Sequence, residues 1–333
     1  MHYGGKLMFG RIMNRYYYGK SGKGDYTKED LPETRWQLFW EMLRVRFTSL
    51  FKLNIIYMVA WIPAIIVIGR GLLLAYNFLG ALSELQLAVE AGEKTAEELL
   101  LSNSQIVEAL KTLAMQTLLL LVPAIAITGP ATAGLCYVTR NWARDEHSFV
   151  LSDFLQVAKE NWKQALATST ITGLVPLVVY MCYTFYGQMA ADNVIFMVPQ
   201  VLSIVVCAVW MCSLLYIYPQ MITYEMSYKT LVRNSIIMAI SCLPMTVALK
   251  LLTLVPAVIL ALVSFFTPYF MLAALAYAVY YVLLGFALSR FVGASYTNGV
   301  FDRMINTRIE GASVGRGLYQ EDDEEETEET TEA

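Results

Sequence analysis

A run of small residues at positions 129–134, Gly-Pro-Ala-Thr-Ala-Gly, has the residue types of a loop that holds a ligand against the backbone. Counting back from Arg140, however, the run lies about two to three turns inside a long apolar stretch, which does not suit an exposed phosphate-binding loop. We therefore expect Pro130 to bend a membrane-spanning helix and the small residues to let another helix approach closely. Gly129, Pro130 and Thr132 are candidate structural or interaction residues on this basis.

Lys250 is a candidate functional residue because it is ionisable and lies within an apolar stretch. Arg70 is not a comparable candidate, since it can lie at the outer interface of a membrane. Charge is costly inside a bilayer, so an ionisable residue there suggests a function by default. Two interpretations stay open. The side chain extends to a cytoplasmic boundary about two turns away, or it makes a polar contact inside the protein. No Asp or Glu lies in the middle of an apolar stretch, so a proton or ion relay is not indicated.

The other reactive side chains form no catalytic or metal-binding pattern. His2 and His147 are the only histidines, and neither has the partners that nucleophilic or metal chemistry requires. The five cysteines fall in or beside apolar stretches without Cys-x-x-Cys spacing, as packing residues do. The sequence also lacks a Walker-type glycine loop, a His-Glu-x-x-His motif and a nucleophile elbow. We therefore expect no enzymatic activity, no metal site, no cofactor and no nucleic-acid partner.

The elements that must position these candidates are membrane-spanning helices. The chain has 333 residues, of which 57% are hydrophobic and 16% charged, and its mean hydropathy of +0.49 exceeds that of a soluble domain. About 20 mostly apolar residues span the hydrocarbon core of a bilayer. The sequence therefore predicts an all-α integral membrane protein with six transmembrane helices, at roughly 53–76, 112–138, 165–186, 195–218, 244–265 and 268–290.

Lysine and arginine divide unevenly between the two sides of these spans. One side holds ten up to Lys52, four in 139–164, two in 219–237 and four from Arg290 onward, whereas the opposite loops hold only two. Short basic flanks are retained in the cytoplasm. The sequence thus predicts a multi-pass protein with cytoplasmic N and C termini.

Three segments, at about 36–51, 151–166 and 228–243, show the apolar spacing that is typical of an amphipathic helix. Each precedes a span with a similar proline, so the sequence predicts three units, each an amphipathic interfacial helix followed by a transmembrane hairpin. Five of the six spans carry a proline well inside, which predicts kinked helices: Pro63, Pro123, Pro176, Pro199 and Pro256.

The same elements divide the chain into three parts. Residues 1–33 form a basic cytoplasmic arm that we expect to be flexible, and residues 34–297 form the six-helix membrane domain. A glutamate-rich connection at about 77–111 predicts a small helical insertion on the outer side. Residues 298–333 form a cytoplasmic tail whose acidic end we expect to be disordered.

The chain resembles the YesL-like family of uncharacterised bacterial integral membrane proteins over about residues 36–297. The residues that carry the resemblance are those at 129–133, the basic turn at 140–144, Phe154, Lys159, Asn161, Trp162 and Lys163. The long outer connection and the acidic tail depart from the family's pattern. The resemblance implies a location in the bacterial cell membrane, and it adds four candidate structural or interaction residues, Arg140, Arg144, Asn161 and Trp162.

The resemblance also implies an accessory or regulatory part in carbohydrate uptake, because genes of the family accompany sugar permeases and polysaccharide-degrading enzymes in Gram-positive bacteria. The family defines no catalytic residues. The expected partners are the lipid bilayer and a sugar-import permease complex. The alternative is a small-solute channel or transporter, or a permease subunit, although the inner loop at 139–165 lacks the Glu-Ala-Ala motif and the downstream Gly of a permease coupling helix. The substrate and the oligomeric state stay open.

Overall fold

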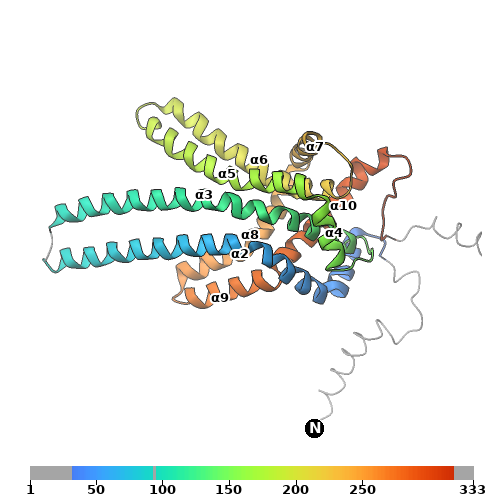
Figure 1. Ribbon diagram of the computed structural model, residues 1–333, viewed down its shortest axis with the longest axis horizontal. Coiled ribbons are helices and arrows are strands. Elements are labelled where there is room, and N and C mark those ends of the chain that lie inside the picture. The colour runs from blue at the N-terminus through green and yellow to red at the C-terminus, as the bar shows by residue number, and fades with distance from the viewer. Residues whose placement is uncertain (1–31, 93–94, 319–333) are drawn as a thin grey trace, which may run out of the picture.

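The computed structural model describes residues 32–92 and 95–318, and every regular element in these ranges is a helix (Figure 1). The expected flexible arm falls almost entirely outside the described residues, and so does the expected disordered acidic end of the tail. The long helices are α2 (Arg35–Glu90), α3 (Ala96–Trp142), α5 (Trp162–Ala190), α6 (Met197–Met221), α8 (Leu243–Phe266), α9 (Phe270–Tyr280) and α10 (Phe286–Met304). The shorter elements are α4 (Ser152–Glu160), α7 (Tyr228–Ser241), the 3-10 turns Val194–Phe196 and Asn306–Arg308, and a π-helical segment at Tyr281–Gly285 that joins α9 to α10.

Six helical stretches are long and apolar enough to cross a membrane. Five predicted spans lie within one of them, and the sixth, 268–290, begins two residues before its helix starts at Phe270. The prediction of an all-α protein with six such helices is therefore confirmed, and the structure indicates a multi-pass membrane protein. Many large apolar side chains on α8 and α9 face outward, such as Leu254, Leu262 and Leu275. Such a surface is suited to contact with lipid.

The first predicted interfacial segment is not a separate helix. It forms the start of α2, which continues as one helix through the first span and reaches Glu90. Thr34 caps the helix by accepting a hydrogen bond from the backbone N–H of Gln37, and no Gly or Pro follows until Pro63. Because nothing in the sequence stops the helix, the amphipathic segment and the span form one element. Figure 1 shows the first turns of α2 set at an angle to the rest of the helix.

The other two amphipathic segments do form helices of their own. Helix α4 buries Phe154 and Val157 and ends at Asn161, directly before α5 begins. Helix α7 buries Leu231 and Ala239, among others, and Cys242 separates it from α8. Whether these helices lie at a membrane interface stays a prediction.

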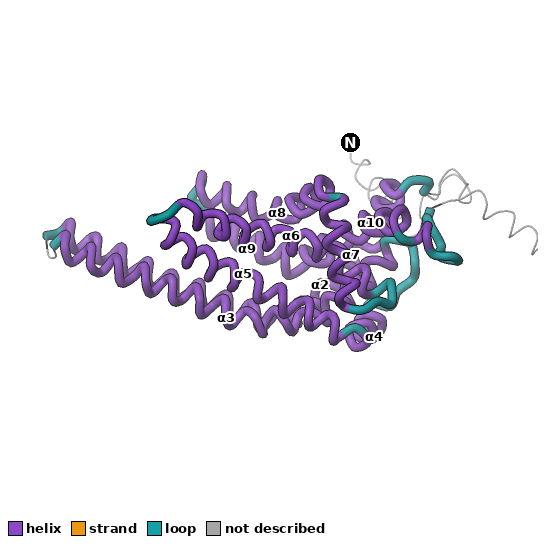
Figure 2. Tube along the Cα trace, turned by 90° about the horizontal axis from the view of Figure 1, so that it is seen from above, coloured by secondary structure: helices purple, strands orange, loops and turns teal. Residues whose placement is uncertain are grey.

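The glutamate-rich connection at 77–111 is helical on both sides of a short turn. Helix α2 runs to Glu90 and α3 begins at Ala96, so both helices continue past the predicted spans, and a short turn containing Gly92 joins them. Whether this end lies on the outer side of a membrane stays a prediction. Figure 2 shows the end of this hairpin well beyond the ends of the other helices.

The proline in α6 also differs from the expectation. Pro199 is the third residue of α6, where its missing N–H removes no helical hydrogen bond, so it does not kink the span. Pro219 is the proline inside this helix. The other spans have interior prolines as predicted, at Pro63, Pro123, Pro176 and Pro256, and α3 carries Pro130 in addition.

Helix α3 holds the bundle together, because it packs against α2, α4, α5, α6 and α10. Consecutive long helices also pack in pairs, α2 with α3, α5 with α6, and α8 with α9. The largest buried cluster joins Leu53 of α2, Trp142 of α3 and Phe291 of α10. Residues from the start, the middle and the end of the described chain therefore meet in one core.

Candidate functional site

The small-residue run of α3 lies where this helix contacts α5 and α4. A Cβ atom added at Gly129 would lie 2.2 Å from Ser169 Oγ and 2.3 Å from the carbonyl oxygen of Ala165. A Cβ atom at Gly134 would lie 2.4 Å from the carbonyl oxygen of Phe154. Only glycine fits at such distances. The run thus sets the spacing between three helices and is not open to a ligand.

Hydrogen bonds also join this part of α3 to α5 and to α2. Ser169 Oγ donates to the carbonyl oxygen of Ala126 across the contact of α3 and α5, at 2.7 Å. Thr132 is buried, and its hydroxyl lies 2.9 Å from the hydroxyl of Tyr57 on α2. Pro130 lies inside α3 between these contacts. Gly129 and Thr132 therefore have partners on two other helices, α5 and α2.

Replacing Gly129 by alanine is expected to lower the free energy of unfolding by about 1–3 kcal/mol, the usual cost of forcing an extra carbon into a packed core. The matched control is Gly69→Ala in α2, because no atom lies within 4 Å of a Cβ added there. Alanine favours helix over glycine, so the control variant should be as stable as the parent protein or slightly more stable. Thermal unfolding of the purified protein in detergent compares the two. Equal melting temperatures for the two variants would contradict the close contact.

Arg144 belongs to a charged cluster at the end of the bundle where the described chain begins and ends. Its guanidinium lies 3.6 Å from Glu146 Oε1, which also pairs with Arg316 at 2.7 Å. Nearby, the start of α2 and the end of α10 are joined by the ion pair of Arg35 with Asp302. The ion pairs thus connect four segments of the chain: the start of α2, the end of α3 with the turn after it, the end of α10, and the segment that contains Arg316.

Arg140 lies one turn earlier on α3, beside the same cluster. Its carbonyl oxygen accepts a hydrogen bond from Asn298 Nδ2 at 3.5 Å, whereas its buried Nε atom has no hydrogen-bond partner among the described residues. Tyr224 is close by and donates to Asn306 Oδ1 at 2.7 Å. Burial raises the pKa of Tyr224 to about 12, although the charge of Arg140 acts in the opposite direction, so its hydroxyl is a neutral donor at physiological pH.

Asn161 and Trp162 lie at the junction of α4 and α5. Asn161 Nδ2 donates to the carbonyl oxygen of Val157 at 3.2 Å, and its own carbonyl accepts the first hydrogen bond of α5 from Ala165. Trp162 is about half exposed, and the ammonium group of Lys163 lies 5.7 Å from its ring. These residues shape a helix junction.

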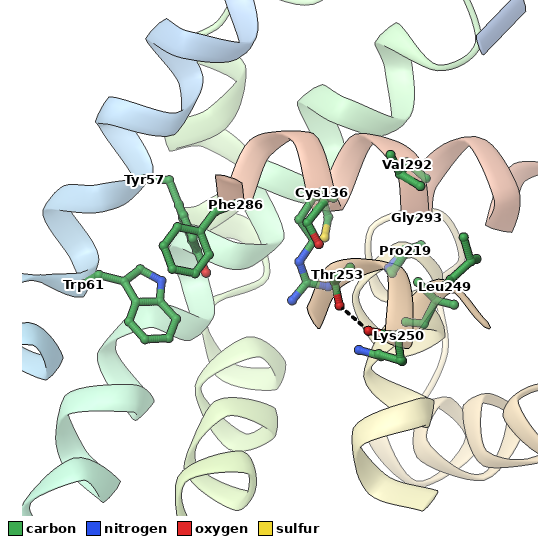
Figure 3. Close-up of a pocket in the computed structure, with 14 residues that line it drawn as sticks. Tyr57, Trp61, Cys136, Pro219, Leu249, Lys250, Thr253, Phe286, Val292 and Gly293 are labelled. Carbon is green, nitrogen blue, oxygen red and sulfur yellow. Dashed lines mark hydrogen bonds between the residues drawn. The ribbon is translucent and has the colours of Figure 1, made fainter. Parts of the chain in front are cut away.

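Lys250 lines an internal cavity of about 170 Å³ in a different part of the bundle (Figure 3). The cavity is formed by residues of α2, α3, α6, α8 and α10. Tyr57, Trp61 and Phe286 lie on one side of it, and Lys250 and Leu249 on the other. Lys250 is seven residues into α8, about 10 Å from its start. Its half-buried side chain faces the cavity, and its ammonium group makes no hydrogen bond to another of the described residues. Whether the side chain extends to a membrane boundary stays open.

Arg290 lines the same cavity, and sequence reasoning missed it because it was counted with the basic flank after the sixth span. The guanidinium donates to the carbonyl oxygen of Leu214 at 3.5 Å and lies 5.4 Å from the ring of Tyr218. One signal could have found it. The apolar helical spacing continues beyond Arg290 through Phe291, Ala294 and Phe301, all buried, so the helix does not leave the bundle at Arg290.

A buried asparagine positions this part of α10. The π-helical segment disrupts the regular hydrogen bonding of the helix, and Asn54 of α2 supplies partners for it. Asn54 Nδ2 donates to the carbonyl oxygens of Tyr281 and Val282 at 2.8 and 2.7 Å, and its Oδ1 accepts from the N–H of Ala287 at 2.8 Å. Arg290 follows within one turn, so this contact sets where its side chain lies.

The structure therefore places the candidates at four sites. The small-residue run, the charged cluster and the α4–α5 junction are packing or ion-pair sites, and Lys250 meets Arg290 at the cavity. Among the residues that the structure describes, no group of three His, Cys, Asp or Glu side chains could hold a metal ion.

Comparison with known proteins reaches only part of the chain. No curated protein and no solved structure matches it. One segment, residues 109–183, matches a family model. The small-residue run, the basic turn and the α4–α5 junction lie inside this segment, whereas Lys250 and Arg290 lie outside it. The finer assignment to YesL-like proteins stays a prediction. Residues 109–183, from α3 through α4 into α5, match the model of a family described as "Protein of unknown function, DUF624".

Proposed function

We propose that this protein recognises a small solute inside its helical bundle and serves as an accessory or regulatory component of carbohydrate uptake. The observation that carries the proposal is the internal cavity, which is lined by charged, aromatic and hydroxyl side chains in a set of helices otherwise apolar enough to span a membrane. Polar cavities between helices are common ligand sites, and ionisable residues within spans commonly face them. The link to carbohydrate uptake is supported by the YesL-like resemblance.

An accessory role also requires a partner, and the projecting α2–α3 hairpin is a suitable surface for one. Tyr180 of α5 donates to the carbonyl oxygen of Lys111, so α5 still contacts α3 at that residue. The 15 residues of α3 that precede Lys111 extend about 20 Å along the helix axis. We propose that a sugar-import permease complex contacts this extension on the outer side of the bacterial cell membrane.

The second candidate is a channel or transporter that moves the solute by itself. It is favoured by the π-helical segment Tyr281–Gly285 beside the cavity and by Pro219 on the cavity wall. Both features break regular helical hydrogen bonding and allow a helix to bend.

Gene deletion, purification from native membranes and a liposome assay together separate the two candidates from each other. An accessory role predicts reduced uptake of at least one oligosaccharide and recovery of a permease when the protein is purified from native membranes. A transporter predicts flux of a solute into liposomes that contain the purified protein alone. Unchanged oligosaccharide uptake, with no permease recovered and no flux, would contradict both.

The proposed orientation has a direct test in cysteine labelling. A cysteine in place of Glu90, which is exposed at the turn of the α2–α3 hairpin, should react with a membrane-impermeant maleimide added to intact cells. A cysteine in place of Lys159, exposed on α4, should react only after the cells are opened, because we place α4 and both termini in the cytoplasm. The parent protein with its native cysteines measures the background. The reverse pattern would overturn the orientation.

A further inference from the structure

We propose that the internal cavity is an anion site in which Lys250 and Arg290 bind the carboxylate or phosphate group of a small solute or of a lipid headgroup. This inference rests on the proposed recognition of a solute in the same cavity, and it names the chemical class of that ligand.

The first argument is charge balance. Lys250 comes from α8 and Arg290 from α10, and both side chains line the one cavity. Neither forms an ion pair with any Asp or Glu in residues 32–92 or 95–318, where the carboxylates that form ion pairs are Glu108, Glu146 and Asp302. Charges removed from water are costly unless they are paired, so the cavity favours a negatively charged occupant.

The second argument is the supply of hydrogen-bond donors. Within the described chain, Lys250 Nζ donates no hydrogen bond to another residue. The guanidinium of Arg290 donates one long hydrogen bond to the carbonyl oxygen of Leu214, faces the ring of Tyr218 and lies beside the thiol of Cys136. The indole N–H of Trp61 is also buried at the cavity wall without a hydrogen-bond acceptor among these residues. An ammonium offers three donors and a guanidinium five. The unused groups are mostly donors, which suits an acceptor-rich anion.

The third argument is the type of cation. A guanidinium presents paired N–H groups that match the oxygens of a carboxylate or phosphate, while an ammonium acts as a mobile point charge. Arg290 is held against Leu214 and Tyr218, so its orientation is fixed. Lys250 lies on α8, whereas Arg290 lies on α10, and the flexible side chain of Lys250 can move to meet the bound group. A neutral sugar would leave both charges uncompensated, and a metal cation would be repelled by them.

The size of the cavity limits the ligand. About 170 Å³ is less than the 300 Å³ or more of typical sites for drug-sized molecules. The apolar and aromatic side chains of Leu249, Tyr57 and Phe286 complete the wall. The site therefore fits one small anionic group with a short attachment and does not fit an oligosaccharide.

The test uses the full-length protein in nanodiscs of phosphatidylcholine, titrated calorimetrically with inorganic phosphate, citrate and neutral saccharides. The parent protein should bind phosphate or citrate. Lys250→Met should weaken that binding about 10- to 100-fold, the effect of losing one or two charge-assisted hydrogen bonds. Lys250→Arg should retain most of it. Lys229→Met is the matched control, because Lys229 is exposed on α7, and it should bind as the parent does.

A second arm separates a soluble anion from a lipid headgroup. In nanodiscs that contain phosphatidylglycerol, a headgroup ligand should stay bound to the parent protein in native mass spectrometry and should block phosphate binding. It should be lost from Lys250→Met, whose thermal unfolding confirms that the variant is folded. Binding of anions with equal affinity by the parent and Lys250→Met would overturn the site. Binding of saccharides alone would overturn the anion class and leave solute recognition intact, whereas no binding of any probe or lipid would contradict both.

Discussion

Replacing Asn54 by leucine should lower the free energy of unfolding by about 3–6 kcal/mol, the largest effect that we expect from a single substitution in this chain. The side chain of Asn54 is fully buried and satisfies two carbonyl oxygens and one N–H around the π-helical segment. Leucine has a similar volume but no polar atoms, so all three backbone groups would lose their partner inside the bundle. Each buried backbone group without a partner costs about 1–3 kcal/mol.

Denaturant titration of the purified protein in detergent measures this loss. The matched control is Asn103→Leu, since Asn103 lies on the exposed surface of α3, and its stability should stay within about 0.5 kcal/mol of the parent. Asn54→Leu should also weaken solute binding at the cavity, because Arg290 follows the segment that Asn54 holds. Stability equal to that of the parent would show that the π-helical segment does not depend on α2.

Replacing Asp302 by alanine should lower the free energy of unfolding by about 2–4 kcal/mol. Asp302 is mostly buried and pairs with Arg35, while it also accepts hydrogen bonds from Asn306 Nδ2 at 2.6 Å and from the N–H of Gly315 at 3.0 Å. Without the carboxylate, Arg35 would remain partly buried with its charge unpaired. Breaking a buried pair costs more than the pair contributes, and partial exposure reduces that cost here.

A double-mutant cycle with Arg35→Met gives the coupling between the two side chains. We expect the double variant to be less destabilised than the sum of the single variants, because removing both charges leaves neither unpaired. Asp192→Ala is the control, since Asp192 is exposed in the turn before α6, and it should change stability little. Strict additivity would show that the ion pair does not tie α2 to α10.

The long helices were predictable because hydropathy and length alone decide where a span can lie. The six predicted spans coincide with helices to within two residues, and the close packing at Gly129 follows from a run of small residues in an apolar stretch. The continuous α2 was also open to prediction, since the sequence between Arg35 and Pro63 contains no residue that stops a helix. The amphipathic pattern was given too much weight there, because it describes one face of a helix and says nothing of where the helix ends.

The cavity was much less predictable, because its residues come from five helices that are distant in the sequence. Asn54 contacts backbone atoms more than 220 residues away, and no local pattern marks such a contact. Lys250 was found because it interrupts an apolar stretch. Arg290 was missed because it follows one, and a basic residue in that position usually marks a membrane boundary.

The most direct test of the account is solute binding by a variant whose cavity is filled. Ser289 lines the cavity, and tryptophan in its place should occupy most of the space. We expect the purified parent protein to bind a small solute, Ser289→Trp to lose that binding, and Ser83→Trp, a change on the exposed surface of α2, to retain it. Calorimetric titration of all three proteins with the same anions and saccharides decides the matter. Binding that survives Ser289→Trp unchanged would contradict recognition in the cavity.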